Sequence, residues 1–179
     1  HSGQIQGFFG PRVPVDNLEA NLVALTICLK NQIPLKDVSV VSPDAGGVTR
    51  AKNFQGLLES FGVKDTTLAM IIKQRVQAGK IGSMHMVGSV EGKNVIIVDD
   101  IIDTAGTLCE AQDIKKYGAL SVSAFATHGL FSGKALDNIK KSQLDQVIAQ
   151  IQFPKGEEEE NTDGKVKRLS LAPILAEAI

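Results

Sequence analysis

The sequence has 179 residues, of which 43% are hydrophobic and 22% are charged, and its formal net charge is −1. These values are typical of a globular domain rather than a disordered chain, and the lack of a basic excess argues against a nucleic-acid-binding surface. No apolar run approaches the roughly 20 residues that span a bilayer. The two cysteines, Cys28 and Cys109, are too few for a disulfide scaffold, so we expect a reducing, cytoplasmic location.

The first fifteen residues are rich in Gly, Gln, Phe and Pro, follow no clear period, and are expected to form an arm or loop. The chain begins with His1 rather than Met and shows no signal peptide, so we expect it to be a piece of a longer protein. A helix signal begins at Asp16, with Glu19 three residues later as a capping-box partner and leucines following at helical spacing.

Strands and helices then alternate along the chain. Residues 38–41 form a short valine-rich strand that runs into a turn over 42–47. The next helix should end at Gly62 and bury one face, made of Ala51, Phe54, Leu58 and Phe61. A β-branched run over 66–72 predicts a buried strand, and the polar, glycine-containing segment 74–83 predicts a mobile loop.

The second half continues the alternation. Strands are predicted over 84–90 and 94–98, a loop over 99–107, a helix from about residue 105 to Gly118, and strands over 120–127 and 146–151. A loop over 128–133 and one more helix separate the last two strands. The acidic segment 154–165 is typical of a solvated linker, and 166–179 predicts a last strand and helix.

This alternation indicates an α/β fold with a mainly parallel sheet flanked by helices. In such sheets, ligands bind beyond the carboxyl ends of the strands. We therefore expect chemistry in the loops after Val41, Ile72 and Val98.

The strand over 94–98 is apolar throughout, as expected when both faces are covered. Carboxylates, threonines and a glycine follow it, in the order Asp99, Asp100, Asp103, Thr104, Gly106 and Thr107. Backbone N–H groups at the start of a helix bind anions, whereas carboxylates suit the hydroxyls of a sugar, with a metal ion as mediator or competitor. The pattern describes a ribose phosphate site; the alternative is an acidic βα turn that binds no ligand. No Gly-Lys-Ser/Thr follows, which excludes a P-loop.

Residues 98–107 resemble the ribose-phosphate-binding signature of the type I phosphoribosyltransferase fold. Four further segments, at 1–9, 41–47, 127–133 and 175–179, follow in the order seen in the ribose-phosphate pyrophosphokinase family. The resemblance therefore covers essentially the whole chain. It implies a type I phosphoribosyltransferase-like fold and an enzyme, a pyrophosphokinase, that makes phosphoribosyl pyrophosphate and AMP from ATP and ribose 5-phosphate with Mg²⁺.

The family's subunit has two similar domains, and the chain resembles the second one with the junction before it. The implied organisation is a junction arm over 1–16, a phosphoribosyltransferase-like domain over 17–153, and an acidic linker with a terminal strand and helix over 154–179. The missing first domain supplies contacts to ATP, so we expect this fragment to be inactive alone. The family also implies homo-oligomers, dimers that assemble into hexamers, with no nucleic-acid or membrane partner.

The resemblance also implies residue roles. Ribose 5-phosphate would be bound by Arg75 and by Asp99, Asp100, Asp103, Thr104, Ala105, Gly106 and Thr107. Lys73 and Arg75 match a catalytic Lys-x-Arg pair on a mobile loop. The pyrophosphate and metal turn would be Asp44, Ala45, Gly46 and Gly47, with His1 and Asp44 as the metal ligands. Without the family match, a Lys-Gln-Arg loop or a terminal histidine is usually a solvated surface feature.

Two departures and two rival functions qualify the resemblance. Gly10 and Pro11 stand where the family has an acidic residue, and residues 155–164 form an unusual acidic insert.

One rival is a base-specific phosphoribosyltransferase, which shares the loop at 99–107 but does not usually carry the segments at 4–9 and 127–129. The other is a non-catalytic regulatory paralogue, which often loses the threonine loop or the Lys-x-Arg pair; both are present here.

Overall fold

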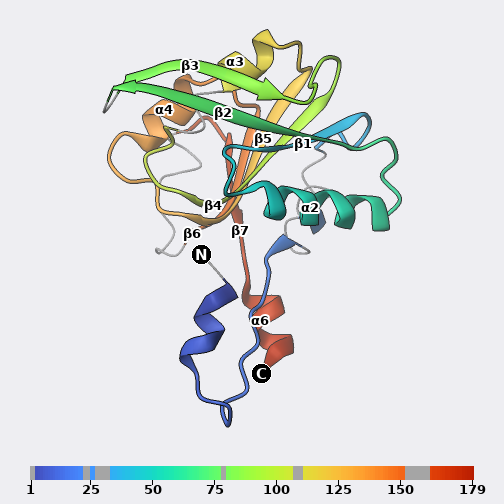
Figure 1. Cartoon of the computed structure of the whole chain (residues 1–179), viewed down its shortest axis with the longest axis vertical. Coiled ribbons are helices and arrows are strands. Elements are labelled where there is room, and N and C mark those ends of the chain that lie inside the picture. The colour runs from blue at the N-terminus through green and yellow to red at the C-terminus, as the bar shows by residue number, and fades with distance from the viewer. Residues whose placement is uncertain (1–2, 22–24, 27–32, 78–79, 107–110, 152–161) are drawn as a thin grey trace.

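The computed structural model describes residues 3–21, 25–26, 33–77, 80–106, 111–151 and 162–179, with the backbone alone described for 73–77, 80–84 and 151. Its centre is one seven-stranded sheet (Figure 1). The strands are β1 (Val38–Ser42), β2 (Thr67–Gln77), β3 (Lys80–Val87), β4 (Asn94–Ile102), β5 (Ser121–Gly129), β6 (Gln146–Ile151) and β7 (Val166–Leu169).

The strand order is β3-β2-β1-β4-β5-β6-β7, and every neighbouring pair is parallel except β2 with β3. The mainly parallel α/β sheet predicted from the sequence is thus confirmed. Because β1 lies between β2 and β4, the loops after these three strands open at the same edge of the sheet. That edge includes the segments after Val41, Ile72 and Val98, in which the sequence predicts chemistry.

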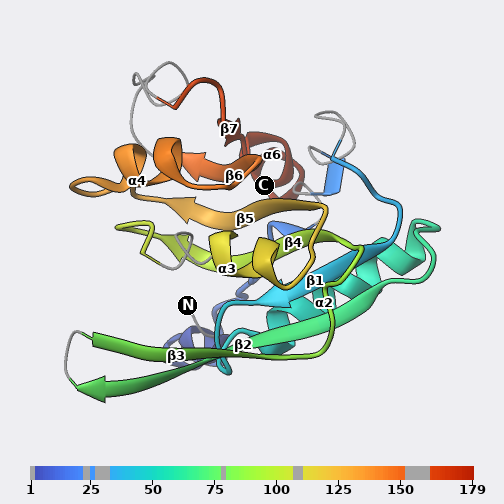
Figure 2. The ribbon, with the colours of Figure 1, turned by 90° about the horizontal axis from the view of Figure 1, so that it is seen from above.

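Helices cover both faces of the sheet. They are α2 (Val48–Ser60), α3 (Ala111–Lys116) and α4 (Ala135–Lys141), and Figure 2 shows α3 on the opposite side of the sheet from α2. Alternate residues of β4 explain this arrangement. Ile96 and Val98 pack in one core with Phe54 of α2, whereas Val95 and Ile97 join the core of α3 and α4. A strand buried on both faces must be apolar at successive positions.

The two ends of the chain lie outside these layers. The 3₁₀ helix η1 (Gly3–Phe8) and helix α6 (Ala172–Ala178) both lie at the lower end of the molecule in Figure 1, beyond the sheet. Phe8 is 90% exposed and no residue of either helix is buried. The helix start predicted at Asp16, with Glu19 as capping-box partner, is wrong, because residues 16–20 are described and are not helical. Residues 21, 25 and 26 are helical, and part of the predicted leucine run lies outside the described residues. The acidic linker is described only from Thr162 onward.

The prediction of a mobile loop over 74–83 is wrong. In its place β2 and β3 form an antiparallel hairpin, paired from Met70 with Val87 to Gln77 with Lys80, with register shifts near Arg75. Backbone pairing depends on the partner strand rather than on side-chain polarity, so a polar, glycine-containing segment can still form a ladder. Residues 78–79 lie outside the described residues.

Two other expectations are corrected in part. Ala51, Phe54 and Leu58 are buried as predicted, but Phe61 is 58% exposed because α2 ends at Ser60. The strand predicted over 94–98 continues to Ile102, so the adjacent aspartates belong to the end of β4 rather than to a loop.

Candidate functional site

The turn after β1 is built around Asp44. Its backbone carbonyl accepts a hydrogen bond from Ser42 Oγ at 2.6 Å, and its Oδ1 accepts one from the amide of Gly47 at 2.9 Å. Asp44, Ala45 and Gly46 are exposed, whereas Gly47 is buried. These bonds close the turn on itself and fix where α2 begins, at the carboxyl end of the sheet.

Gly47 is required by close packing. A Cβ at this position would lie 2.8 Å from Ser42 Oγ and 3.2 Å from Nη1 of Arg50. The first of these separations is too short for a Cβ carbon and an oxygen that are not bonded, so the Ser42 side chain would have to shift. The turn therefore needs a residue with no side chain at this position. The predicted glycines thus have a geometric role before any ligand is considered.

The two aspartates at the end of β4 share one cation, Arg50. Its Nη2 lies 2.8 Å from Asp100 Oδ2, and its Nη1 lies 3.4 Å from Asp99 Oδ1. Arg50 stands in the first turn of α2, so this double ion pair joins the turn after β1 to the end of β4. Sequence reasoning missed Arg50. The available signal was its position three residues after the glycine pair. This places Arg50 at the amino-terminal end of α2, which lies at the carboxyl edge of the sheet.

Burial raises the pKa of Asp99 from 3.8 to about 6. The hydrogen bond from the backbone amide of Asp100, at 2.8 Å, lowers this pKa, the neighbouring Asp100 carboxyl raises it, and the charge of Arg50 lowers it. The Asp99 side chain is 16% exposed. A carboxylate removed from water in this way favours a partner that can donate hydrogen bonds to it, such as a cation or a hydroxyl.

The loop after β4 forms the second part of the site. A cavity of about 120 Å³ is lined by Asp99, Ile101, Ile102, Asp103, Thr104, Ala105 and Gly106. Ala105 is buried and has φ of +58°, in the left-handed region that non-glycine residues seldom occupy. Such strained positions are common where a backbone binds a ligand. Of the sugar-phosphate residues predicted from 99 to 106, all but Asp100 line this one cavity.

The segment after β5 supports this loop from the side. The amides of Leu130 and Ser132 donate to the carbonyls of Ile102 and Asp103, at 2.8 and 3.0 Å. Asn138 of α4 donates its side-chain amide to the Thr104 carbonyl at 3.3 Å. The motif at 127–133 thus has a structural use, because it holds the loop after β4 in place.

The remaining predicted residues are placed less fully. Lys73 and Arg75 lie in β2 beyond Met70, which pairs with Ser42, so their backbone is at the carboxyl edge beside the Asp44 turn. Their side chains are not among the described parts of the chain. His1 and Thr107 also lie outside the described residues.

The acidic residues of the site do not form a closed metal cage. Among the described residues, no group of three or more His, Cys, Asp or Glu side chains could hold a metal ion. Mg²⁺ rarely needs such a cage, since it keeps several waters and is usually held by one or two carboxylates together with substrate phosphates. The exposed carboxylate of Asp44 is a hard oxygen donor of the required kind, so the donor chemistry at this turn fits that ion.

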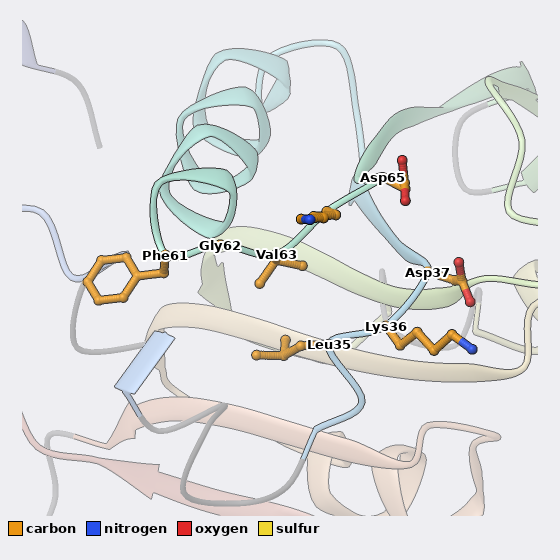
Figure 3. Close-up of a pocket in the computed structure, with 8 residues that line it drawn as sticks. Leu35, Lys36, Asp37, Phe61, Gly62, Val63 and Asp65 are labelled. Atoms are coloured by element: carbon orange, nitrogen blue, oxygen red, sulfur yellow. The ribbon is translucent and has the colours of Figure 1, made fainter.

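A larger cavity, of about 350 Å³, lies at the opposite end of the sheet (Figure 3). It is formed by the segments that precede β1 and β2 and by the end of α2, and none of the predicted site residues lines it. Figure 3 shows Asp37 and Asp65 on one side of it and Phe61 on the other. Its position at the amino ends of the strands separates it from the carboxylates and the loop after β4.

Comparison of the sequence with models of known protein families identifies the family of this chain. A model of the phosphoribosyl synthetase-associated domain matches residues 60–179, which is more than half of the chain. The chain belongs to the phosphoribosyl synthetase family. The resemblance seen in the sequence motifs is therefore confirmed.

Relatives of the phosphoribosyl synthetase family match over the whole chain. Proteins named ribose-phosphate pyrophosphokinase, which are transferases, are 42% identical in Marinomonas sp. and 46% identical in Shewanella oneidensis. Each match covers 100% of this chain and 54% of the relative. The chain therefore spans about half the length of the curated relatives it matches.

A solved structure supports the same assignment. The phosphoribosylpyrophosphate synthetase of Mycobacterium smegmatis superposes with a TM-score of 0.79 at 34% identity, over 99% of this chain and 54% of that one. The type I phosphoribosyltransferase-like fold class is thereby confirmed. Among the described residues, no helix has both the length and the apolar character needed to cross a bilayer.

Proposed function

We propose that this chain is the second domain of a ribose-phosphate pyrophosphokinase. The complete enzyme transfers the pyrophosphoryl group of ATP to the 1-hydroxyl of ribose 5-phosphate, giving phosphoribosyl pyrophosphate and AMP. One observation carries the proposal: the paired carboxylates of Asp99 and Asp100 adjoin a strained backbone loop, from Asp103 to Gly106, at the end of one buried strand. The names of the relatives, which share 42–46% identity, support the same reaction.

The two parts of the site bind different parts of ribose 5-phosphate. The backbone and hydroxyl donors from Asp103 to Gly106 bind the 5-phosphate, because backbone N–H groups in a loop between a strand and a helix favour an anion. Asp99 and Asp100 accept hydrogen bonds from the ribose 2- and 3-hydroxyls. Phosphate and carboxylates repel each other, so each must face a different part of the ligand.

The Asp44 turn lies next to this pair, through Arg50, and is suited to the pyrophosphoryl group. Mg²⁺, when bound with ATP, would neutralise charge on the transferred phosphates, and Asp44 together with His1 would help to hold it. The 1-hydroxyl oxygen loses its proton to water and forms a bond to the β-phosphorus, the bond from that phosphorus to the α,β-bridging oxygen breaks, and AMP leaves with this oxygen. Lys73 and Arg75 stabilise the charge that develops on the phosphate oxygens.

The resemblance extends the proposal to the whole enzyme. A first domain completes the ATP site, and subunits assemble as dimers and then hexamers. The low cysteine content suits a cytoplasmic enzyme of nucleotide biosynthesis. The chain alone should bind ribose 5-phosphate but should release little or no AMP.

The test is an assay of AMP release from ATP and ribose 5-phosphate, with Mg²⁺ and no free base, on the complete enzyme. Formation of AMP and phosphoribosyl pyrophosphate in equal amounts supports the proposal. Turnover that requires a free purine or pyrimidine base would instead identify a base-specific phosphoribosyltransferase. Absence of turnover with intact ribose 5-phosphate binding would identify a regulatory paralogue.

A further inference from the structure

Arg50 connects two parts of the site that come from different segments of the chain. It belongs to α2, fifty residues before Asp100, and its guanidinium contacts both carboxylates at the end of β4. The side chains are partly buried, with 25% exposure for Arg50, 16% for Asp99 and 30% for Asp100. Ion pairs with this burial are screened less by water than pairs on the surface, so they hold their geometry better.

Two adjacent carboxylates need such a partner. Without a cation between them, their mutual repulsion favours side-chain rotamers that point apart, or protonation of one of them. A guanidinium has donors in a fixed planar fork, so one Arg can orient two acceptors at once. Arg50 uses Oδ1 of Asp99 and Oδ2 of Asp100, which leaves one oxygen of each carboxylate outside its contacts. One remaining acceptor oxygen on each carboxylate could serve one of the two hydroxyls of a vicinal diol.

We propose that Arg50 is a positioning residue, which holds the carboxylates of Asp99 and Asp100 in the orientation that recognises the 2,3-diol of the sugar. It thereby sets the preference of the site for ribose 5-phosphate over 2-deoxyribose 5-phosphate. Arg50 acts through the aspartates and needs no contact with the substrate itself. The inference rests on the proposed function, because it takes a ribose phosphate as the ligand.

The packing around Gly47 ties Arg50 to its place. A Cβ at position 47 would approach Arg50 Nη1 to 3.2 Å, so the turn after β1 leaves just enough room for the guanidinium. A side chain at position 47 would therefore crowd the guanidinium where it contacts the two aspartates. A residue that only shields surface charge would not need such a close fit.

The experiment compares three variants of the complete enzyme: Arg50→Gln, Arg50→Lys and the control Lys52→Gln. Lys52 is exposed on the same helix, so the control removes the same charge away from the site. For each protein, KM and kcat are measured for both substrates, and the dissociation constants of ribose 5-phosphate and 2-deoxyribose 5-phosphate are measured by calorimetry.

We expect Arg50→Gln to raise the KM for ribose 5-phosphate roughly tenfold or more, as for a lost hydrogen bond to a charged group, with less than a threefold change for ATP. The affinity ratio of ribose 5-phosphate to 2-deoxyribose 5-phosphate should fall toward one. Arg50→Lys should recover part of both effects, and Lys52→Gln should match the parent enzyme.

Other outcomes overturn the inference. If Arg50→Gln lowers thermal stability but leaves the ribose preference intact, Arg50 only supports the fold. If both substrates are affected equally, the guanidinium does not act through the diol site. Failure of the parent enzyme to release AMP would count against the proposed function alone, because the calorimetric preference between the two sugars still tests Arg50 independently.

Discussion

The backbone amide of Ser132 donates a hydrogen bond to the carbonyl of Asp103, at 3.0 Å. This bond joins the segment after β5 to the loop that lines the cavity after β4. The amide of Leu130 makes a similar bond to Ile102 at 2.8 Å. The conformation of the proposed phosphate loop therefore depends on residues that a ligand would never contact.

Gly129→Ala tests this dependence. A Cβ at Gly129 would lie 2.6 Å from the ring of Phe131 and 3.0 Å from the Cβ of Ala149, and Phe131 is buried with φ of +49°. The ring has little freedom to move, so we expect a loss of about 1–3 kcal/mol in the free energy of unfolding and weaker binding of ribose 5-phosphate. Urea unfolding and calorimetry measure the two effects.

The control for Gly129→Ala is Gly56→Ala. Gly56 is exposed within α2, and a Cβ there meets nothing within 4 Å. Alanine in a helix interior is favoured by about 1 kcal/mol over glycine, so this variant should be more stable than the parent. Equal effects of the two substitutions would show that the segment after β5 does not constrain the loop.

Asp103→Asn and Thr104→Val address the proposed phosphate loop directly. Both residues are exposed and line the cavity after β4. A hydrogen bond from the Thr104 hydroxyl to a charged phosphate is worth roughly 1.5–3 kcal/mol, so Thr104→Val should raise the KM for ribose 5-phosphate by at least tenfold with little effect on ATP. Asp103→Asn keeps the backbone donor and should raise that KM less. Steady-state kinetics of the complete enzyme measure both constants. A change confined to the ATP constant would contradict the assignment.

Asp99→Asn should change how stability varies with pH. Because burial raises the pKa of Asp99 to about 6, the folded protein holds a proton that the unfolded chain has lost between pH 4 and pH 6. The stability that this proton contributes is fully present below pH 4 and is lost as the pH rises through 6, up to about 3 kcal/mol in total. In the Asn variant, the free energy of unfolding should not decrease for this reason as the pH rises, because asparagine does not ionise. Urea unfolding of the two proteins at pH 4, 5, 6 and 7 compares the slopes, and parallel curves would contradict the raised pKa.

Lys73→Ala should reduce turnover more than substrate binding. Lys73 lies in β2 at the carboxyl edge, where its backbone pairs with that of Met84 in the β2–β3 hairpin. If its cation acts mainly on the transferring phosphates, kcat falls while the KM values change little. Exposed Lys64, which precedes β2 at the opposite end of the sheet, provides the control Lys64→Ala. Parental kcat in the Lys73 variant would make it an ordinary strand lysine.

Much of the fold follows from local sequence. The strand at 146–151 matches its predicted bounds, and the apolar run at 94–98 correctly marks a strand that is covered on both faces. Both strands are buried on both faces, and such strands can be recognised in a sequence because they are apolar at successive positions. The residues from Asp99 to Gly106 could likewise be grouped from the sequence, because they are neighbours along the chain.

What the sequence did not reveal depends on tertiary placement. Arg50 has the appearance of an ordinary charged residue on an amphipathic helix until α2 is packed beside β4. The β2–β3 hairpin was mistaken for a loop because its pairing is carried by the backbone and its composition is polar. Both errors concern contacts between segments, whereas the correct predictions concern features within one segment.

The strand order also has a consequence for how the chain folds. Gln77 and Lys80 of the β2–β3 hairpin pair across two residues, whereas Val38 of β1 pairs with Asn94 of β4, 56 positions away. Hairpins close within about 1–10 μs, but a parallel pair must first overcome the entropy of a long loop. We therefore expect the hairpin to form early and the β1–β4 pairing to limit the rate. The ion pairs of Arg50 depend on that late pairing, so the site is assembled only when the central sheet is complete.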